Sequence, residues 1–221
     1  MGKKCCIVLL FSLFFLLITA TGCRDTGSFA VAGKAGTLGL GGEVTAGLAT
    51  DINVRVGING LDFDIDDEEI EDVSYKTRGD LSSMSALLDW HIFDDPFHLT
   101  AGIISMDNEL RLDATPSQPV EIGDHYYTPS EVGTLTGRAK IDGIAPYFGI
   151  GWGNPMQSRR RWGFTLDLGV ALTDAPEASL SATGMAAGLQ QDLERERQKI
   201  EDDLDPIRFY PVISLGLFIR F

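Results

Sequence analysis

The sequence has few cysteines, few basic residues and only one long hydrophobic run. Of its 221 residues three are cysteine, at positions 5, 6 and 23. Eighteen Lys and Arg stand against 32 Asp and Glu, so the formal net charge is −14. Because nucleic-acid binding needs clustered basic side chains, this balance argues against a nucleic-acid partner. A hydrophobic content of 44% excludes a wholly disordered chain, and the length suits one domain.

The hydrophobic run lies at the N-terminus. It follows two lysines, extends from Cys5 to Ala20 and leads into small residues, which is the three-part layout of a secretory signal peptide. A single transmembrane anchor is the alternative, but the run is short for one and the next residues are Gly-rich. We therefore expect residues 1–22 to be a signal peptide and residues 23–221 to be the mature domain.

Cys23 has two interpretations. The segment 19–23, Thr-Ala-Thr-Gly-Cys, resembles the lipobox of bacterial lipoproteins, although Ala20 stands where Leu is usual. That resemblance implies a lipidated Cys23 tethered to a membrane. Ordinary cleavage nearby instead leaves Cys23 as a free thiol or removes it. Either way the mature chain has at most one cysteine, which excludes internal disulfides and Cys-based metal sites.

The rest of the chain alternates between apolar and polar residues with a period of two. Seven segments of about ten residues show this pattern, which is typical of a transmembrane β-barrel. A soluble β-sandwich is the alternative. Export, segment length and small residues between the apolar ones favour the barrel. The segments cover residues 38–48, 52–58, 84–92, 97–103, 144–152, 162–172 and 209–221.

A closed antiparallel barrel needs an even number of strands. The only room for an eighth strand beside the seven is about residues 28–35, with Gly36-Thr37 as a tight turn. We therefore predict an all-β fold, an eight-stranded antiparallel transmembrane barrel. A different pairing remains open, in which residues 36–49 form one long strand and the eighth strand comes from a loop.

The connections between these segments alternate in length. Short turns occur at 49–51, 93–96 and 153–160. The three tryptophans all lie beside such turns, Trp90 before 93–96 and Trp152 and Trp162 on either side of 153–160, as in an interfacial aromatic girdle. Long segments at 64–80, 113–137 and 173–206 are expected to be outer loops, because bacterial barrels have short periplasmic turns and long extracellular loops.

Two of the long segments have a character of their own. Residues 62–72 contain eight acids; a solvated loop is the main interpretation, and weak sharing of divalent cations is the lesser one. Residues 189–204 place Leu189, Leu193, Ile200 and Leu204 on one helical face, and Pro206 follows. This predicts a short amphipathic helix in the last outer loop, which either packs over the barrel mouth or contacts a partner.

The C-terminus resembles a known signal. It ends in Phe221, with Ile219 and Leu217 at alternate positions before it, like the segment that the outer-membrane assembly machinery reads. With the export signal, residues 28–221 resemble the small Gram-negative outer-membrane barrels of the OmpA, OmpX and OmpW class. The stretches 87–91 and 149–153 resemble a proteobacterial branch of such proteins that carries no assigned activity. The resemblance implies an outer-membrane location and contacts with lipid, lipopolysaccharide and that machinery.

Candidates for chemistry are sparse. Charges inside a narrow barrel should be paired, so we expect a structural ion-pair network in the lumen from Glu43, Arg55, Asp89 and Asp167. The histidines His91, His98 and His125 lack a nucleophile motif. We expect no catalytic, metal or cofactor site and no enzyme. A structural or surface-interaction role is the main hypothesis. A narrow channel or binding barrel for small, even apolar, molecules comes second, and a lipid-modifying enzyme third.

Overall fold

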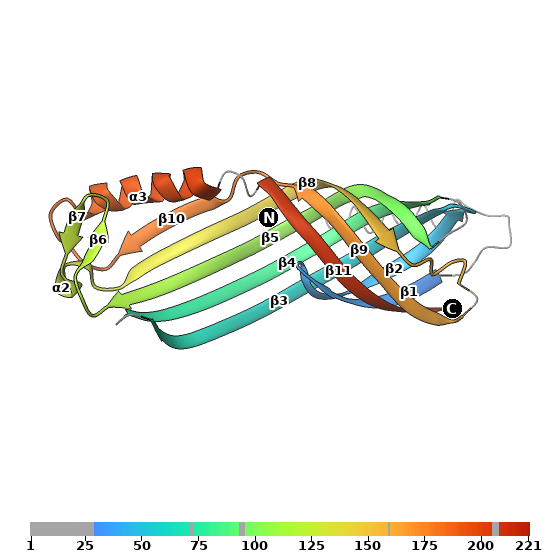
Figure 1. The fold of residues 1–221 in the computed structure, drawn as a ribbon, viewed down its shortest axis with the longest axis horizontal. Helices are drawn as coiled ribbons and strands as arrows, with labels where there is room; N and C mark the ends of the chain where they lie inside the picture. The colour runs from blue at the N-terminus through green and yellow to red at the C-terminus, as the bar shows by residue number, and fades with distance from the viewer. Residues whose placement is uncertain (1–28, 71–72, 93–95, 159, 205–207) are drawn as a thin grey trace, which may run out of the picture.

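The computed structural model describes residues 29–70, 73–92, 96–158, 160–204 and 208–221 (Figure 1). The signal segment 1–22, Cys23, and residues 71–72 of the acidic segment lie outside the described residues. The described elements are β1 (Phe29–Gly36), β2 (Gly39–Ala49), β3 (Ile52–Ile70), β4 (Val73–His91), β5 (Phe97–Pro116), β6 (Val120–Ile122), β7 (His125–Tyr127), α2 (Pro129–Val132), β8 (Leu135–Trp152), β9 (Trp162–Leu172), β10 (Glu177–Ala182), α3 (Leu189–Leu204) and β11 (Phe209–Arg220).

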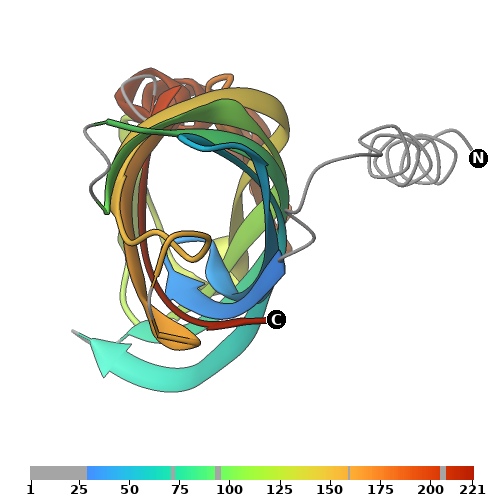
Figure 2. The ribbon, with the colours of Figure 1, turned by 90° about the vertical axis from the view of Figure 1, so that its right-hand side faces the viewer.

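Eight of the strands close into an antiparallel barrel. Their order is β1-β2-β3-β4-β5-β8-β9-β11, and β11 pairs back onto β1. The predicted eight-stranded barrel is therefore confirmed, and Figure 2 shows the ring from one end. The alternative with one long strand over 36–49 is wrong, because Gly36 pairs with Gly39 across a tight turn that separates β1 from β2.

The outer surface of the barrel is an apolar band. In β9 the residues Phe164, Leu166 and Leu168 are exposed on the outside, while Thr165 and Asp167 between them are buried. The eleven residues of β9, tilted as barrel strands are, span about 25 Å, the height of the apolar band of a transmembrane barrel. At one end of the band the tryptophans Trp90, Trp152 and Trp162 are exposed outward beside the short turns, as the sequence predicted.

Four barrel strands continue far beyond the band at the opposite end. The β2–β3 pairing stops at Leu40 and Gly60, whereas β3 and β4 remain paired as far as Ile70 and Val73. β5 and β8 continue beside them, and β10 adds to the free edge of β8. We call this one-sided sheet the extension; it fills the left of Figure 1. The expected loop at 64–80 was therefore wrong, because β3 and β4 pair through most of it. The expected loop at 113–137 was wrong only at its ends, where β5 reaches Pro116 and β8 begins at Leu135.

The side-chain pattern changes phase where the strands leave the barrel. In β5 the apolar residues Leu99 and Ile103 face outward, but farther along Leu110 and Leu112 fall on the side that continues the lumen. In the extension the apolar residues therefore lie on the inner face and charged residues on the outer one, the pattern expected where a strand passes from a lipid-facing wall into water. β3, β4 and β8 change phase in the same way. The inner face of the extension carries Leu61, Phe63, Ile65, Tyr75, Leu81, Leu110, Leu112, Ala114, Leu135 and Leu180.

The helix α3 packs on one margin of this inner face. Leu189 and Leu193 are buried against Ile122 and Tyr127 of the β6–β7 hairpin, and Leu135 and Leu180 pack against the same cluster. The predicted amphipathic helix before the last strand is confirmed, and it covers the β8–β10 side of the sheet (Figure 1). No helix among the described residues is long and apolar enough to span a membrane.

Candidate functional site

The lumen on the tryptophan side of the barrel is filled by an ion-pair network centred on Arg55. The Arg55 guanidinium lies 2.7 Å from Asp89 Oδ2, 3.0 Å from Asp167 Oδ1 and 3.3 Å from Glu43 Oε1, and all four side chains are buried. These are the four residues named from the sequence, and the structure brings them together from β2, β3, β4 and β9. β2, β3 and β4 are neighbours in one wall and β9 lies opposite β3 in the ring, so the Arg55 side chain bridges from its own wall to Asp167 on the facing one.

Lys34 is a fifth member, which the sequence reasoning missed. Its Nζ lies 2.8 Å from Asp167 Oδ2 and 3.1 Å from Glu43 Oε2. The sequence did contain a signal for it. Lys34 is in the same alternation as Ala30 and Ala32, the two buried residues of β1 that face the barrel lumen. A lysine in line with two small inward residues points to a lumen charge. With Lys34, three carboxylates face two permanent cations in this layer.

His98 and a polar layer lie next to the network on its turn side. His98 Nε2 lies 3.3 Å from Asp167 Oδ1, and its ring lies 5.0 Å from that of His91. Asn53 Nδ2 lies 2.9 Å from His91 Nε2. Gly151 makes room for these groups, because a Cβ at that position would overlap the His98 ring and approach Asp167 Oδ1 to 2.9 Å.

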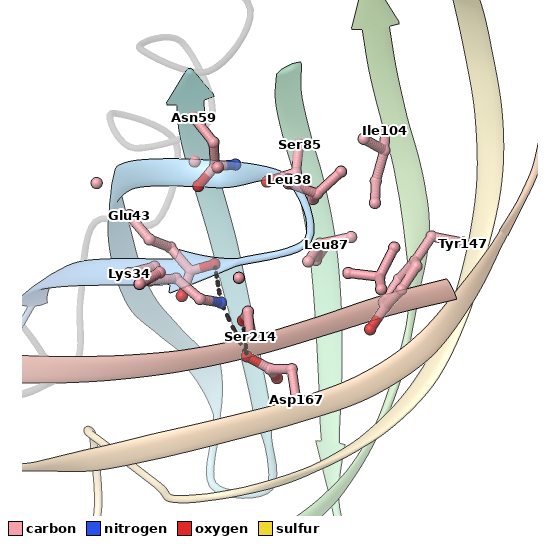
Figure 3. Close-up of a pocket in the computed structure, with 16 residues that line it drawn as sticks. Lys34, Leu38, Glu43, Asn59, Ser85, Leu87, Ile104, Tyr147, Asp167 and Ser214 are labelled. Carbon is pink, nitrogen blue, oxygen red and sulfur yellow. Dashed lines mark hydrogen bonds and ion pairs between the residues drawn. The ribbon is translucent and has the colours of Figure 1, made fainter. Parts of the chain in front are cut away.

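The other half of the lumen is apolar. Leu38, Leu87, Ile104 and Val212 pack around Tyr147, whose side chain is fully buried. Between this cluster and the ion pairs lies a cavity of about 30 Å³, large enough for one or two water molecules. Figure 3 shows Lys34 and Tyr147 on two sides of this cavity. Side chains from both halves therefore project into the lumen around this cavity.

The remaining candidates lie apart from the network. His125 is in the β6–β7 hairpin, where its Nδ1 lies 2.8 Å from Asp192 Oδ2. The ring of Phe221 stacks on that of Phe29 with the centroids 5.3 Å apart, and Ile219 and Leu217 are exposed on the outer face of the barrel. Within the part of the chain that the structure describes, no group of three or more His, Cys, Asp or Glu side chains is arranged to hold a metal ion.

The buried carboxyl of Asp192 ties α3 to the β6–β7 hairpin. It accepts a hydrogen bond from the Tyr127 hydroxyl at 2.7 Å and lies 3.1 Å from Arg195 Nη1. The bond from Tyr127, helped by His125 and Arg195, holds the pKa of Asp192 below its usual range despite burial. These contacts fix the helix against the hairpin at the outer end of the extension.

Comparison with solved structures shows the same fold in two proteins. Acinetobacter baumannii CarO2 aligns with a TM-score of 0.66 and 21% identity, over 90% of this chain and 100% of that one. CarO from the same species aligns with a TM-score of 0.65 and 19% identity, over 87% and 97%. This likeness is one of fold alone. The sequence matches no protein-family model and no curated protein.

The sequence reasoning missed the inner face of the extension altogether. Its signal was the change of phase, which in β3 occurs between Ile58 and Leu61 across Asn59-Gly60. In such a segment apolar residues occupy every second position, one position is skipped, and the apolar residues then continue on the opposite face. This pattern indicates a single strand that passes from lipid to water. The acids at 62 and 64 are then the outer-face partners of apolar residues at 61, 63 and 65.

Proposed function

We propose that the protein is an outer-membrane β-barrel that is closed to solutes and presents its extension outside the cell as an interaction surface. The short turns and both barrel termini lie at one end, which is the periplasmic end in bacterial barrels, so the extension would project from the outer leaflet. The sequence signal for export and the fold shared with CarO2 and CarO support this location.

The observation that carries the closed barrel is the Arg55 network. The Arg55 guanidinium binds Glu43 and Asp89 on the two neighbouring strands and Asp167 on the facing wall, so these side chains span the lumen. An eight-stranded barrel has an interior just wide enough for side chains. A channel or binding barrel has less support, because the cavity of about 30 Å³ is below the size of a metabolite. A lipid-modifying enzyme also has less support, because the contacts seen for the lumen histidines join His91 to Asn53 and His98 to Asp167, an amide and a carboxylate.

Conductance tests this proposal. The purified protein in planar bilayers should show no stable channel steps, and liposomes that contain it should not swell in small sugars or amino acids. An Arg55→Ala, Lys34→Ala double variant serves as the positive comparison, since it removes both permanent cations that cross the lumen. Steady conductance or swelling by the unmodified protein would exclude the closed barrel and favour the channel.

Processing and assembly belong to the same proposal. Cleavage after residue 22 leaves Cys23 six positions before β1, and intact-mass measurement shows directly whether it carries acyl chains. Phe221, Ile219 and Leu217 would form the segment read by the assembly machinery. Removing Phe221 should then lower the amount of protein in the outer membrane, whereas detergent refolding of the same variant should remain efficient. Outer-membrane lipid and lipopolysaccharide would surround the band.

A further inference from the structure

One long edge of the extension lies open. β3 has β2 on one side only as far as Gly60, and from Leu61 to Ile65 it pairs with β4 alone. Among the described residues no strand covers the opposite side of this segment. Such an edge has a row of backbone N–H and C=O groups directed outward, which is the template for adding another strand.

The two faces beside this edge have opposite character. On the inner face Leu61 is 37% exposed and Ile65 is 48% exposed, with Phe63 half-buried between them. On the outer face Asp62 and Asp64 are exposed. A strand added to this edge would therefore place alternate side chains against apolar and acidic neighbours.

Charge decides what kind of strand fits the outer face. Asp62 is directly opposite Asp80 on β4, and Asp80 is opposite Glu109 on β5, so three acids form a row that ends at the open edge. Like charges in adjacent positions of a sheet repel, and an opposite charge placed next to them is stabilising. In the next row Asp64 already has a cation, Arg78 Nε at 3.1 Å, in an exposed pair that contributes little.

We propose that the open edge of β3 at 61–65 binds an extended peptide in which apolar residues alternate with Lys or Arg. The peptide would continue the sheet by backbone hydrogen bonds, place its apolar side chains beside Leu61, Phe63 and Ile65, and place a basic side chain beside Asp62. A second copy of this chain fits poorly, because pairing two such edges would bring acids against acids. The inference rests on the proposed surface role and names the class of partner.

The direct test is binding of short labelled peptides to the full-length protein in detergent, measured by fluorescence anisotropy. A peptide of alternating Val and Lys should bind. Its Val–Glu counterpart, and a peptide of the same composition with the Lys residues contiguous, should each bind about tenfold or more weakly. Asp62→Asn should weaken the Val–Lys peptide, whereas Asp142→Asn, on the same outer face but on β8, should not.

Backbone methylation separates strand addition from simple charge attraction. In an extended peptide all Val N–H groups point to one edge and all Lys N–H groups to the other. Of two peptides, one N-methylated at every Val and the other at every Lys, one should lose binding and the other keep it. Equal binding of both, or unchanged binding by Asp62→Asn, would overturn the proposal. The proposal would also be overturned if the protein formed a concentration-dependent dimer that Ile65→Lys abolishes, since that result would show that the edge binds a second copy of the chain.

The two proposals fail in different ways. A barrel that conducts but binds the alternating peptide refutes the closed lumen and leaves the edge proposal standing. A silent barrel that does not bind the peptide refutes the edge proposal alone.

Discussion

Replacing Arg55 by methionine should destabilise the barrel more than any other single loss of charge in the lumen. The side chain bridges three buried carboxylates at 2.7 to 3.3 Å. After Arg55→Met, Asp89 keeps the Thr100 hydroxyl at 2.8 Å, while Glu43 and Asp167 share Lys34. Removing one partner of a buried ion pair typically costs about 3–5 kcal/mol, because a charge is left buried without compensation.

The assay is reversible urea unfolding in lipid vesicles, with the free energy of unfolding taken from linear extrapolation. Arg111→Met is the matched control. Arg111 pairs with Asp113 at 3.1 Å on the outer face of the extension, where both side chains are partly exposed, so its loss should cost about 1 kcal/mol or less.

A second variant tests the reason for the effect. Arg55→Met combined with Asp89→Asn removes one of the uncompensated carboxylates and keeps a group that bonds Thr100. The double variant should be more stable than the single one by about 0.5–3 kcal/mol, the range of coupling energies found for residues in direct contact. If Arg55→Met costs no more than Arg111→Met, the lumen charges are hydrated and the closed-lumen reasoning is refuted.

Three further predictions follow from other contacts. Gly151→Ala should lower the free energy of unfolding by about 1–3 kcal/mol through overpacking against the lumen, whereas Gly33→Ala, whose Cβ meets nothing within 4 Å, should be nearly neutral; equal effects would contradict the packing. Leu168→Arg, on the outer face of β9, should lower the free energy of unfolding by about 2–4 kcal/mol if Leu168 lies at mid-membrane, and a cost near zero would place Leu168 at the membrane border or outside the bilayer. The pKa of Asp192 is lowered in the folded protein. The Asp192 carboxylate therefore stabilises the packing of α3 above the ordinary carboxyl pKa, and this stabilisation is lost as the pH falls toward the lowered pKa of the folded state. Hydrogen exchange of the α3 amides should therefore quicken on acidification to about pH 3 in the native chain, after correction for the intrinsic rate. Asp192→Asn should remove that dependence.

Local alternation was enough to predict the barrel. In β9 and β11 every second residue is apolar, and both strands cross the band in full and end near its borders. The first strand was the hardest to predict, since it has Ala and Gly where the others have Leu and Ile, and only the even strand count required it. The structure confirms that strand as Phe29–Gly36.

The extension could not be predicted from the sequence, because the alternation rule assumed that the outer face of every strand contacts lipid along its whole length. Residues 61–65 and 110–114 alternate as clearly as the barrel strands, but with the opposite phase relative to their own strand. If lipid is assumed outside every strand, their apolar residues fall on the wrong face, so these segments are taken for loops. The acids at 62–72 favour the same interpretation. Only the pairing of β3 with β4, and of β5 with β8, shows that these strands do not stop at the membrane border.

The sequence by itself determined the class of fold, the strand parity, the helix at 189–204 and the four residues named for the lumen network, because each depends on period, count or charge along the chain. Tertiary structure decided which of these meet. Lys34 and Asp167 are 133 positions apart in sequence, yet their charged atoms lie 2.8 Å apart since β1 and β9 both flank β11. It also decided that β2 ends while β3 continues. That difference in strand length leaves the open edge, and no periodicity within a single strand specifies it.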